Sequence, residues 1–332
     1  MSNQEEFVRH RLHAGLSAGM VSRLIPLLAI GGLLAACREA EAPLGPPITA
    51  SQFSHASGHG LQGAIAFHRE IGDVEIFAMN ADGSAEIQLT DNTAQEFSPV
   101  WSPDGKWIAF SSNRDGDFEI YVMRANGTGV TQLTHDTDQE FFTPIWSPNG
   151  KRILFTGVRV VGDFDVEAFV MNANGTGLTQ LTNAAGLSVP TAWSPDGRRI
   201  AFLSDGEIFV MNVDGTRVIQ LTHNTARDEG DRAGWSPDGR RFVFSSDRDG
   251  GDLDIFVMNA DGSRVRQLTH NDGVDDDDPV WSPDGKHIAF ASTRDGDGEI
   301  FVMNADGTGV TQLTFNEGLS DGVPSWRARP LP

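Results

Sequence analysis

Four consecutive carboxylates, Asp275 to Asp278, form the densest group of potential metal ligands in this chain of 332 residues. Carboxylate oxygens are the hard ligands that Ca²⁺ prefers, so the run predicts a calcium site. Its spacing differs from that of an EF-hand loop, and the pairs Asp115/Asp117 and Asp295/Asp297 match that loop no better. The alternative is a solvated acidic loop that binds no metal, and the sequence leaves both open.

The other reactive side chains show little sign of a catalytic centre. Neither the HExxH metal-binding pattern nor a phosphate-binding loop occurs. His135, His223 and His270 each follow a Gln-Leu-Thr phrase. In a repeating structure these histidines would be distributed among the repeats instead of gathering around one metal. The chain has a single cysteine, Cys37, so it forms no intramolecular disulfide.

A repeated unit must position these side chains. Six tryptophans mark its copies, at intervals of 45, 47, 42, 46 and 45 residues. Five lie in a Trp-Ser-Pro-Asp/Asn-Gly phrase and the sixth in a shortened form of it, at Trp101, Trp146, Trp193, Trp235, Trp281 and Trp326. Repeats of this length are typical of a closed ring or a solenoid in which each unit packs on its neighbours.

Each unit contains four segments of strand length. Apolar residues alternate with a period of two, as in 286–291 and 299–303, which is typical of β-strands. The Ser-Pro-Asp-Gly and Asn-Ala-Asp-Gly phrases between segments are typical of tight turns. Four-stranded antiparallel units repeated around an axis form a β-propeller. The sequence therefore predicts an all-β, six-bladed β-propeller.

The two ends of the repeat region predict how the ring closes. The first repeat begins with the second strand of a blade, Gly63 to Arg69, and the chain finishes with a first strand, Val323 to Arg327. We expect this C-terminal strand to complete the N-terminal blade. Four prolines precede a repeat tryptophan by two residues, on the innermost strand, where a missing N–H does no harm; they are Pro99, Pro144, Pro279 and Pro324.

These phrases, in this order and spacing, resemble the TolB-like β-propeller repeat family over residues 63–327. The resemblance implies a six-bladed ring and a protein of the bacterial cell envelope. Propellers of pectin-degrading lyases look similar and hold a metal with histidines over the central channel. The segments of this chain that are expected to line the channel contain no histidine.

The N-terminal residues resemble a bacterial lipoprotein signal. Residues 24–36 are an apolar run that ends in Leu-Ala-Ala before Cys37, like a lipobox, and the run is too short to span a bilayer. We expect lipidation of Cys37 and a location in the periplasm or on the cell surface. By the same resemblance, Arg38 favours anchoring in the outer membrane. The expected organisation is a signal peptide over 1–36, a flexible tether over 37–62, the propeller over 63–327 and a tail over 328–332.

Charge divides the predicted disc into two faces. The chain has 46 acidic and 25 basic residues, a net charge of −21, which argues against nucleic acid as a partner. The loops from second to third strands and from fourth to first strands emerge on one face, and they contain 33 acidic and 7 basic residues. Such a face is typical either of a solubilising surface or of one that attracts a basic protein or cations. The sequence leaves these alternatives open.

We expect a basic patch of an envelope protein to bind this face near the channel mouth. The candidate contact residues are Asp136, Asp138, Glu140, Phe141, Phe142, Asp228, Glu229, Asp231, Asp275, Asp276, Asp277 and Asp278. Phe141 and Phe142 would be apolar anchors, but packing beneath the loop is the stronger alternative because Phe97 fills an equivalent place. The predicted function is that of a non-enzymatic, lipid-anchored scaffold or binding protein. The alternative is a metal-dependent polysaccharide lyase or hydrolase that uses the channel.

Two charged positions recur near the hairpin that joins the second and third strands. An acidic residue occurs in all six repeats, at Glu75, Glu119, Glu167, Glu207, Asp254 and Glu299. An arginine precedes it in five repeats, at Arg69, Arg114, Arg159, Arg248 and Arg294. We expect each arginine to bind that carboxylate across the hairpin.

Overall fold

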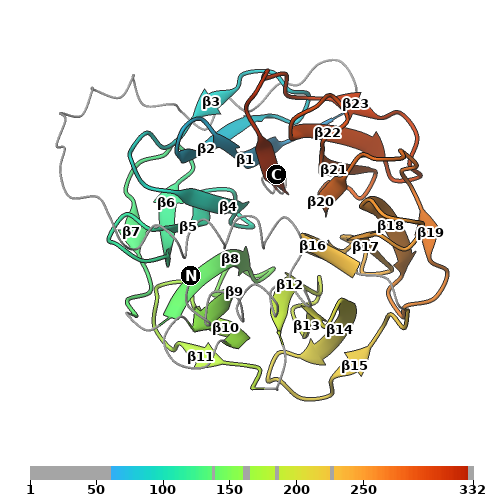
Figure 1. Ribbon diagram of the computed structural model, residues 1–332. Helices are drawn as coiled ribbons and strands as arrows, with labels where there is room; N and C mark the ends of the chain where they lie inside the picture. Colours follow the sequence, from blue (N-terminus) through green and yellow to red (C-terminus); the bar gives the residue numbers. More distant parts are fainter. Residues whose placement is uncertain (1–60, 137–138, 160–164, 184–186, 225–227, 328–332) are drawn as a thin grey trace, which may run out of the picture.

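The computed structural model describes residues 61–136, 139–159, 165–183, 187–224 and 228–327. These residues form six antiparallel sheets of four strands each, arranged as blades around a central axis (Figure 1). No helix in the described ranges is long and apolar enough to cross a membrane. The predicted all-β, six-bladed β-propeller is confirmed.

Each blade is built from four strands, which follow one another from the axis to the rim. The innermost strands are β4 (Glu96–Trp101), β8 (Gln139–Trp146), β12 (Val189–Trp193), β16 (Asp228–Trp235), β20 (Asp276–Trp281) and β24 (Asp321–Trp326). The second strands are β1 (Ala64–Glu70), β5 (Trp107–Ser112), β9 (Arg152–Arg159), β13 (Arg199–Ser204), β17 (Arg241–Ser246) and β21 (His287–Ser292). The third strands are β2 (Val74–Asn80), β6 (Glu119–Arg124), β10 (Asp165–Asn172), β14 (Glu207–Asn212), β18 (Asp254–Asn259) and β22 (Glu299–Asn304). The outer strands are β3 (Ile87–Gln88), β7 (Thr131–Gln132), β11 (Thr179–Gln180), β15 (Ile219–Gln220), β19 (Arg266–Gln267) and β23 (Thr311–Gln312).

The ring closes through a blade that is shared by the two ends of the repeat region. Blade one has the strand order β24-β1-β2-β3, and blades two to six follow in chain order from β4. The register pairs Ile65 with Trp326 and Arg69 with Asp321. Closure of the N-terminal blade by the C-terminal strand, as predicted, is confirmed. Because both neighbours of every blade are then present, no sheet face is left without a partner.

The repeat tryptophans pack between blades. Trp326 is 8% exposed and belongs to a cluster with Ile65 and Phe67 of blade one and Ile300 and Leu313 of blade six. Trp101 joins blade two to blade one in the same way. A cation or imidazole covers four of these rings from a neighbouring blade, in the pairs Arg199–Trp235, Arg241–Trp281, His287–Trp326 and Arg327–Trp101. The ring is therefore held by apolar packing with stacked charges at its edge.

The turn phrases keep the blades close to one another. In the Ser-Pro-Asp-Gly turn of blade two, the Asp104 carboxylate accepts hydrogen bonds from Ser102 Oγ at 2.7 Å and from the Lys106 N–H at 3.1 Å. In the Asn-Ala-Asp-Gly turn of blade six, Gly307 has φ = 87°. A Cβ atom there would lie 2.8 Å from the carbonyl oxygen of Leu268 in blade five. This glycine is required both by its dihedral angle and by the close approach of the next blade.

The prolines lie on the innermost strands, as expected, and each is accompanied by an irregularity. Pairing between β4 and β5 shifts between Phe97 and Val100, which brackets Pro99. The residue before that proline, Ser98, has φ = 53°. The same combination occurs at Pro144, Pro279 and Pro324, where the preceding residues also have positive φ. These bulges bend the innermost strands where they approach the axis.

Candidate functional site

One side of the disc carries the loops from second to third strands and from fourth to first strands, and we call it the loop face. We call the opposite side the turn face. Acidic side chains dominate the loop face. Among the described residues, those exposed on it are Glu70, Asp91, Asp115, Asp205, Asp249, Asp272, Asp275, Asp295 and Glu317. Only two described arginines of this face are exposed, Arg114 and Arg159. The predicted excess of negative charge therefore reaches solvent.

Part of the negative charge is neutralised inside the blades by buried ion pairs. Arg69 binds Asp321 through Nε at 2.6 Å and Nη2 at 2.8 Å, and it also binds Glu86 through Nη1 at 2.6 Å. Arg294 donates to Asp276 at 2.9 Å. Equivalent pairs join Arg114 to Glu96 and Arg248 to Asp228. Four of these carboxylates are the first residues of innermost strands, while Arg69 lies in β1 and the other three arginines lie two residues beyond the second strands.

The predicted partner of these arginines was wrong. The acidic partner is the first residue of the innermost strand. Arg69 is opposite Asp321 in the sheet register. The other three arginines lie two residues beyond a serine that is opposite the carboxylate, as Arg114 follows Ser112 opposite Glu96.

Blade four has neither member of the pair. It has no arginine in the hairpin, and Ser188, the residue before its innermost strand β12, stands at the position that Glu96 occupies in blade two. Blade three has Arg159 in the hairpin but Phe141 at that position, so the arginine is not always accompanied by this carboxylate.

The recurring carboxylates of the third strand instead hold the loop that follows the outer strand. The N–H of Asn92 donates to Glu75 at 2.6 Å, and the N–H of Asp136 donates to Glu119 at 2.6 Å. In blade five, Thr269 Oγ1 donates to Asp254 at 2.8 Å. These three carboxylates are 1% exposed. Burial raises the pKa of Glu75 and Glu119 to about 7 and the pKa of Asp254 to about 6.

These raised pKa values predict that stability falls as pH rises. The folded protein binds protons more tightly at these carboxyls than the unfolded chain does, so their stabilising protonation is lost between about pH 4.5 and pH 7. At pH 8 the free energy of unfolding of the variant Glu119→Gln should therefore exceed that of the parent by about 1–3 kcal/mol. Its melting temperature should be correspondingly higher. The difference should vanish near pH 5. Exposed Glu317→Gln is the control, and an equal effect of both substitutions on melting curves at pH 8 would contradict this account.

The candidate contact residues differ in how far their side chains are exposed. Asp275 is exposed, whereas Asp136 and Glu140 are half-buried. Burial and the charge of Asp117 raise the pKa of Glu140. Asp228 and Asp276 are buried and bind arginines within the blade. Asp138 lies outside the described residues, and the side chains of Glu229 and Asp231, in β16, also lie outside the description.

The run Asp275 to Asp278 does not act as one group of ligands. Asp275 accepts the N–H of Leu253 at 3.0 Å, Asp276 binds Arg294, and Asp277 accepts from Ser245 Oγ at 2.7 Å. Asp276 and Asp278 are buried and Asp277 is half-buried. Successive side chains of a strand point to opposite sides, which separates these carboxylates. A calcium ion on this run stays a prediction.

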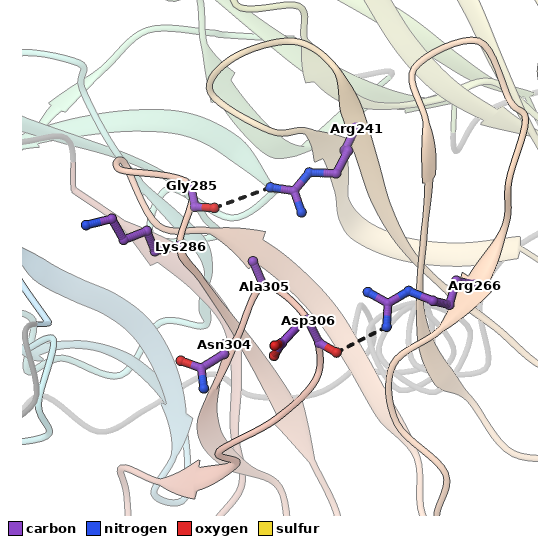
Figure 2. Close-up of a pocket in the computed structure, with 7 residues that line it drawn as sticks. All are labelled: Arg241, Arg266, Gly285, Lys286, Asn304, Ala305 and Asp306. Atoms are coloured by element: carbon purple, nitrogen blue, oxygen red, sulfur yellow. Dashed lines mark hydrogen bonds between the residues drawn. The ribbon is translucent and has the colours of Figure 1, made fainter.

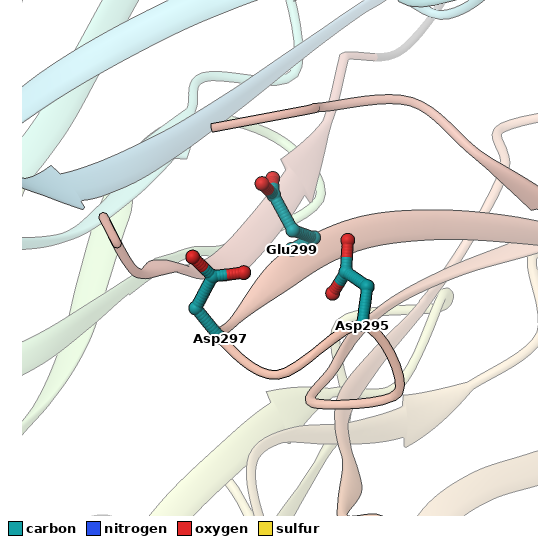
Figure 3. A group of neighbouring side chains, drawn as sticks. All are labelled: Asp295, Asp297 and Glu299. Carbon is teal, nitrogen blue, oxygen red and sulfur yellow. The ribbon is translucent and has the colours of Figure 1, made fainter. Parts of the chain in front are cut away.

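A different acidic group is compact. Oxygen atoms of Asp295, Asp297 and Glu299, from the hairpin between β21 and β22, lie within 4.8 Å of one another (Figure 3). The sequence pattern pointed to the first two of these residues but not to Glu299. All three already accept hydrogen bonds, from Gln312, from the N–H of Gly318, and from Thr314 and Asn316 respectively. The group therefore has a structural role in holding the loop before β24.

Phe141 and Phe142 offer no surface to a partner. They are 0% and 6% exposed, so their proposed role as contact anchors is corrected to packing beneath the loop. The Phe142 ring lies 4.8 Å from that of Phe118, which in turn lies 5.9 Å from Phe97. This row of aromatic rings joins blades two and three below the loop face. The expectation that packing is the stronger alternative agrees with this burial.

The three repeated histidines are separated, as expected. His135, His223 and His270 are exposed and lie three residues beyond the ends of the outer strands of blades two, four and five. The outer strands β7, β15 and β19 belong to three different blades at the rim of the ring (Figure 1). The histidines do not converge on a metal.

The strand order, the ring closure and the repeated turns together define a six-bladed β-propeller with an acidic loop face. The chain belongs to the TolB beta propeller domain family, whose model matches residues 50–167 and 233–329. TolB from Acinetobacter baumannii is similar in structure, with a TM-score of 0.72 and 22% identity over 82% of this chain and 68% of that one. A putative TolB from Agrobacterium tumefaciens has a TM-score of 0.62 and 22% identity over 76% of this chain and 89% of that one. At this identity the two structures show a shared fold.

A curated relative matches a short stretch only. Dipeptidyl-peptidase 5 of Porphyromonas gingivalis is 51% identical over 39 residues, which are 12% of this chain and 6% of that protein. A match of 39 residues is shorter than one repeat, so it reflects the propeller unit and carries no information about the peptidase activity.

Proposed function

We propose that this protein is a non-enzymatic binding protein of the bacterial cell envelope, whose loop face and channel mouth bind a basic patch on a protein partner. Membership of the TolB propeller family supports the envelope location. The observation that carries the binding role is the surplus of exposed acids on the loop face, whose arginines are mostly engaged within the blades. A surface whose charges are mostly of one sign raises the rate of encounter with a partner of opposite charge.

The structure narrows the proposed contact surface. Asp275, Asp136 and Glu140 of the original candidates retain exposed or half-exposed carboxylates, and Asp272 and Asp295 add to them on blade six. Asp228 and Asp276 are excluded, because both carboxylates are buried and a partner would have to compete with their ion pairs to Arg248 and Arg294. The surface is therefore a ring of loop carboxylates and not a single acidic run.

We also propose that the protein is anchored through a lipid on Cys37. The chain enters the propeller at Leu61 on the turn face, where the carbonyl of Gly63 accepts the N–H of Ala81 in a turn. An anchor attached on that side would direct the acidic loop face away from the membrane. Mass spectrometry of the N-terminus of protein from the native host tests the anchor, and an unmodified Cys37 there would refute it.

The binding role predicts a specific kinetic effect of charge removal. The variant Asp272→Asn/Asp275→Asn/Asp295→Asn removes three exposed charges from the loop face. It should slow association with the partner by about tenfold at low salt and flatten the salt dependence, while changing dissociation little. The partner is captured from envelope extract with the immobilised parent protein, and rates are then measured by biosensor.

A matched control removes the same charge from the other face. Asp82, Asp214 and Asp261 are turn residues whose carboxylates accept a neighbouring N–H. Asparagine can accept the same bonds, so their replacement should leave the fold and the association rate within about twofold of the parent. Equal slowing by both triple variants would show that the loop face is not the binding surface.

A further inference from the structure

A basic hollow lies on the turn face between blades five and six. It has a volume of about 370 Å³, and its charged lining consists of Arg241, Arg266, Lys286 and Asp306 (Figure 2). Three cationic side chains and one carboxylate therefore line it. In a chain with a net charge of −21, such a local excess of positive charge is unusual.

The two arginines reach the hollow from blade five and bind only backbone carbonyls of blade six. Arg241 Nη2 donates to the carbonyl of Gly285 at 3.5 Å, and Arg266 Nη1 donates to the carbonyl of Asp306 at 3.1 Å. The Arg241 guanidinium also lies 4.5 Å from the centre of the Trp281 ring, which holds it in place. A guanidinium has five N–H donors, so most of the donors at this hollow remain available.

Neither of these arginines has a carboxylate partner among the described residues, in contrast to Arg69, Arg114, Arg248 and Arg294 on the loop face. The carboxylate of Asp306 is engaged with the N–H and Oγ1 of its own turn residue Thr308, at 3.0 and 2.6 Å. It keeps its negative charge, because the hydrogen bonds from Thr308 and the charge of Arg266 lower its pKa, so it offsets one of the three cations. Lys286 lies at the opposite rim, where its side chain is 75% exposed and its Nζ lies 3.9 Å from Asp284 Oδ2.

The repeats show that this hollow is particular to one place in the ring. A basic residue follows each Ser-Pro-Asp/Asn-Gly turn, so Lys286 has equivalents in other blades. Arg266 has none, because the corresponding residues of the outer strands are Ile87, Thr131, Thr179, Ile219 and Thr311. The combination of two arginines and a lysine is thus a property of the groove between blades five and six, and the general repeat does not require it.

We propose that this hollow binds a phosphate group carried by a larger molecule. Two guanidinium groups can each bind an oxyanion with two parallel N–H bonds, and the added lysine suits the double charge of a phosphate monoester. The volume exceeds what a bare phosphate needs and is at the lower end of small-ligand sites. The phosphate belongs either to a soluble compound or to a phospholipid headgroup, since the hollow opens on the face where the chain enters the propeller.

The first experiment uses inorganic phosphate with the full-length protein. Titration calorimetry at constant ionic strength, with chloride as the reference anion, should show saturable binding. Arg266→Ile, which copies blade four, should weaken it by about tenfold through loss of charge-assisted hydrogen bonds. Arg217→Ser removes the same charge from an exposed residue elsewhere on the turn face and should leave binding unchanged. Melting curves without phosphate establish that both variants are folded.

Absence of saturable phosphate binding by the parent, or equal weakening in the two variants, would overturn the proposal. A second arm distinguishes the source of the phosphate. Vesicles that contain an anionic phospholipid and compete with inorganic phosphate in the parent, but not in Arg266→Ile, would support the site with a headgroup as its ligand. Vesicles that do not compete, with phosphate binding intact, would support the site with a soluble phosphate compound as its ligand.

Discussion

A chain that ends at Ser320 is expected to lose the cooperative folding of the ring, because the deletion removes all of β24 from blade one. It exposes β1 as a sheet edge and removes Trp326 from the cluster with Ile65 and Phe67. It also leaves the buried Arg69 without Asp321. Loss of a buried aromatic residue alone costs about 3–5 kcal/mol, which is comparable with the whole stability of many domains. We expect a loss of more than about 5 kcal/mol, or a melting temperature lower by about 10 °C or more.

Calorimetry of the truncated protein tests this expectation against a chain that ends at Arg327, which retains β24 and should melt within about 1–2 °C of the parent. A synthetic peptide of residues 319–332 provides a second control, since adding it should restore part of the lost stability by occupying the vacant strand position. A truncated protein that melts cooperatively at the temperature of the full chain would contradict closure by β24.

Replacing Arg69 with methionine is expected to destabilise the protein by about 3–5 kcal/mol. Arg69 is buried and binds two carboxylates, Asp321 and Glu86, whose side chains are 0% and 33% exposed. Without the guanidinium, Asp321 becomes a buried charge with no cation beside it. The measurement is the free energy of unfolding in urea, made at pH 7.5.

The double variant Arg69→Met/Asp321→Ser copies the composition of blade four, which has a serine at the position of Asp321 and no arginine. It should recover most of the loss, to within about 1–2 kcal/mol of the parent, because the buried charge has gone. The single variant Arg114→Met is the comparison in blade two. The Arg114 side chain is 26% exposed but its partner Glu96 is 0% exposed, so this variant should also be destabilised by a buried carboxylate that has lost its cation. A double variant as unstable as Arg69→Met would mean that packing of the Arg69 side chain, and not its charge, stabilises this blade.

Local patterns in the sequence were sufficient to predict the fold. Apolar residues alternate with a period of two between turn phrases, and this alternation is a direct consequence of strand geometry. The spacing of the tryptophans predicted six equivalent units, and the strand order at Gly63 and Val323 predicted that one blade is shared. Each of these inferences needs only residues that are neighbours along the chain or equivalent positions in different repeats.

The partners of the charged side chains were decided by the tertiary structure. Arg69 binds Asp321, which lies 252 residues away, and not the nearby Glu75. Asp275 and Asp276 are adjacent in sequence, yet one is exposed and the other is buried against Arg294. Composition alone therefore predicted an acidic face correctly but could not tell which carboxylates reach solvent.

The hollow between blades five and six was likewise decided by the tertiary structure. Arg266 is an ordinary outer-strand residue in the sequence, and it meets the turns of blade six only because adjacent blades pack face to face. Periodicity determines which residues form strands, since that depends on backbone geometry within a few residues. Sheet register and blade packing determine which side chains meet, since those contacts join residues that the chain separates by tens or hundreds of positions.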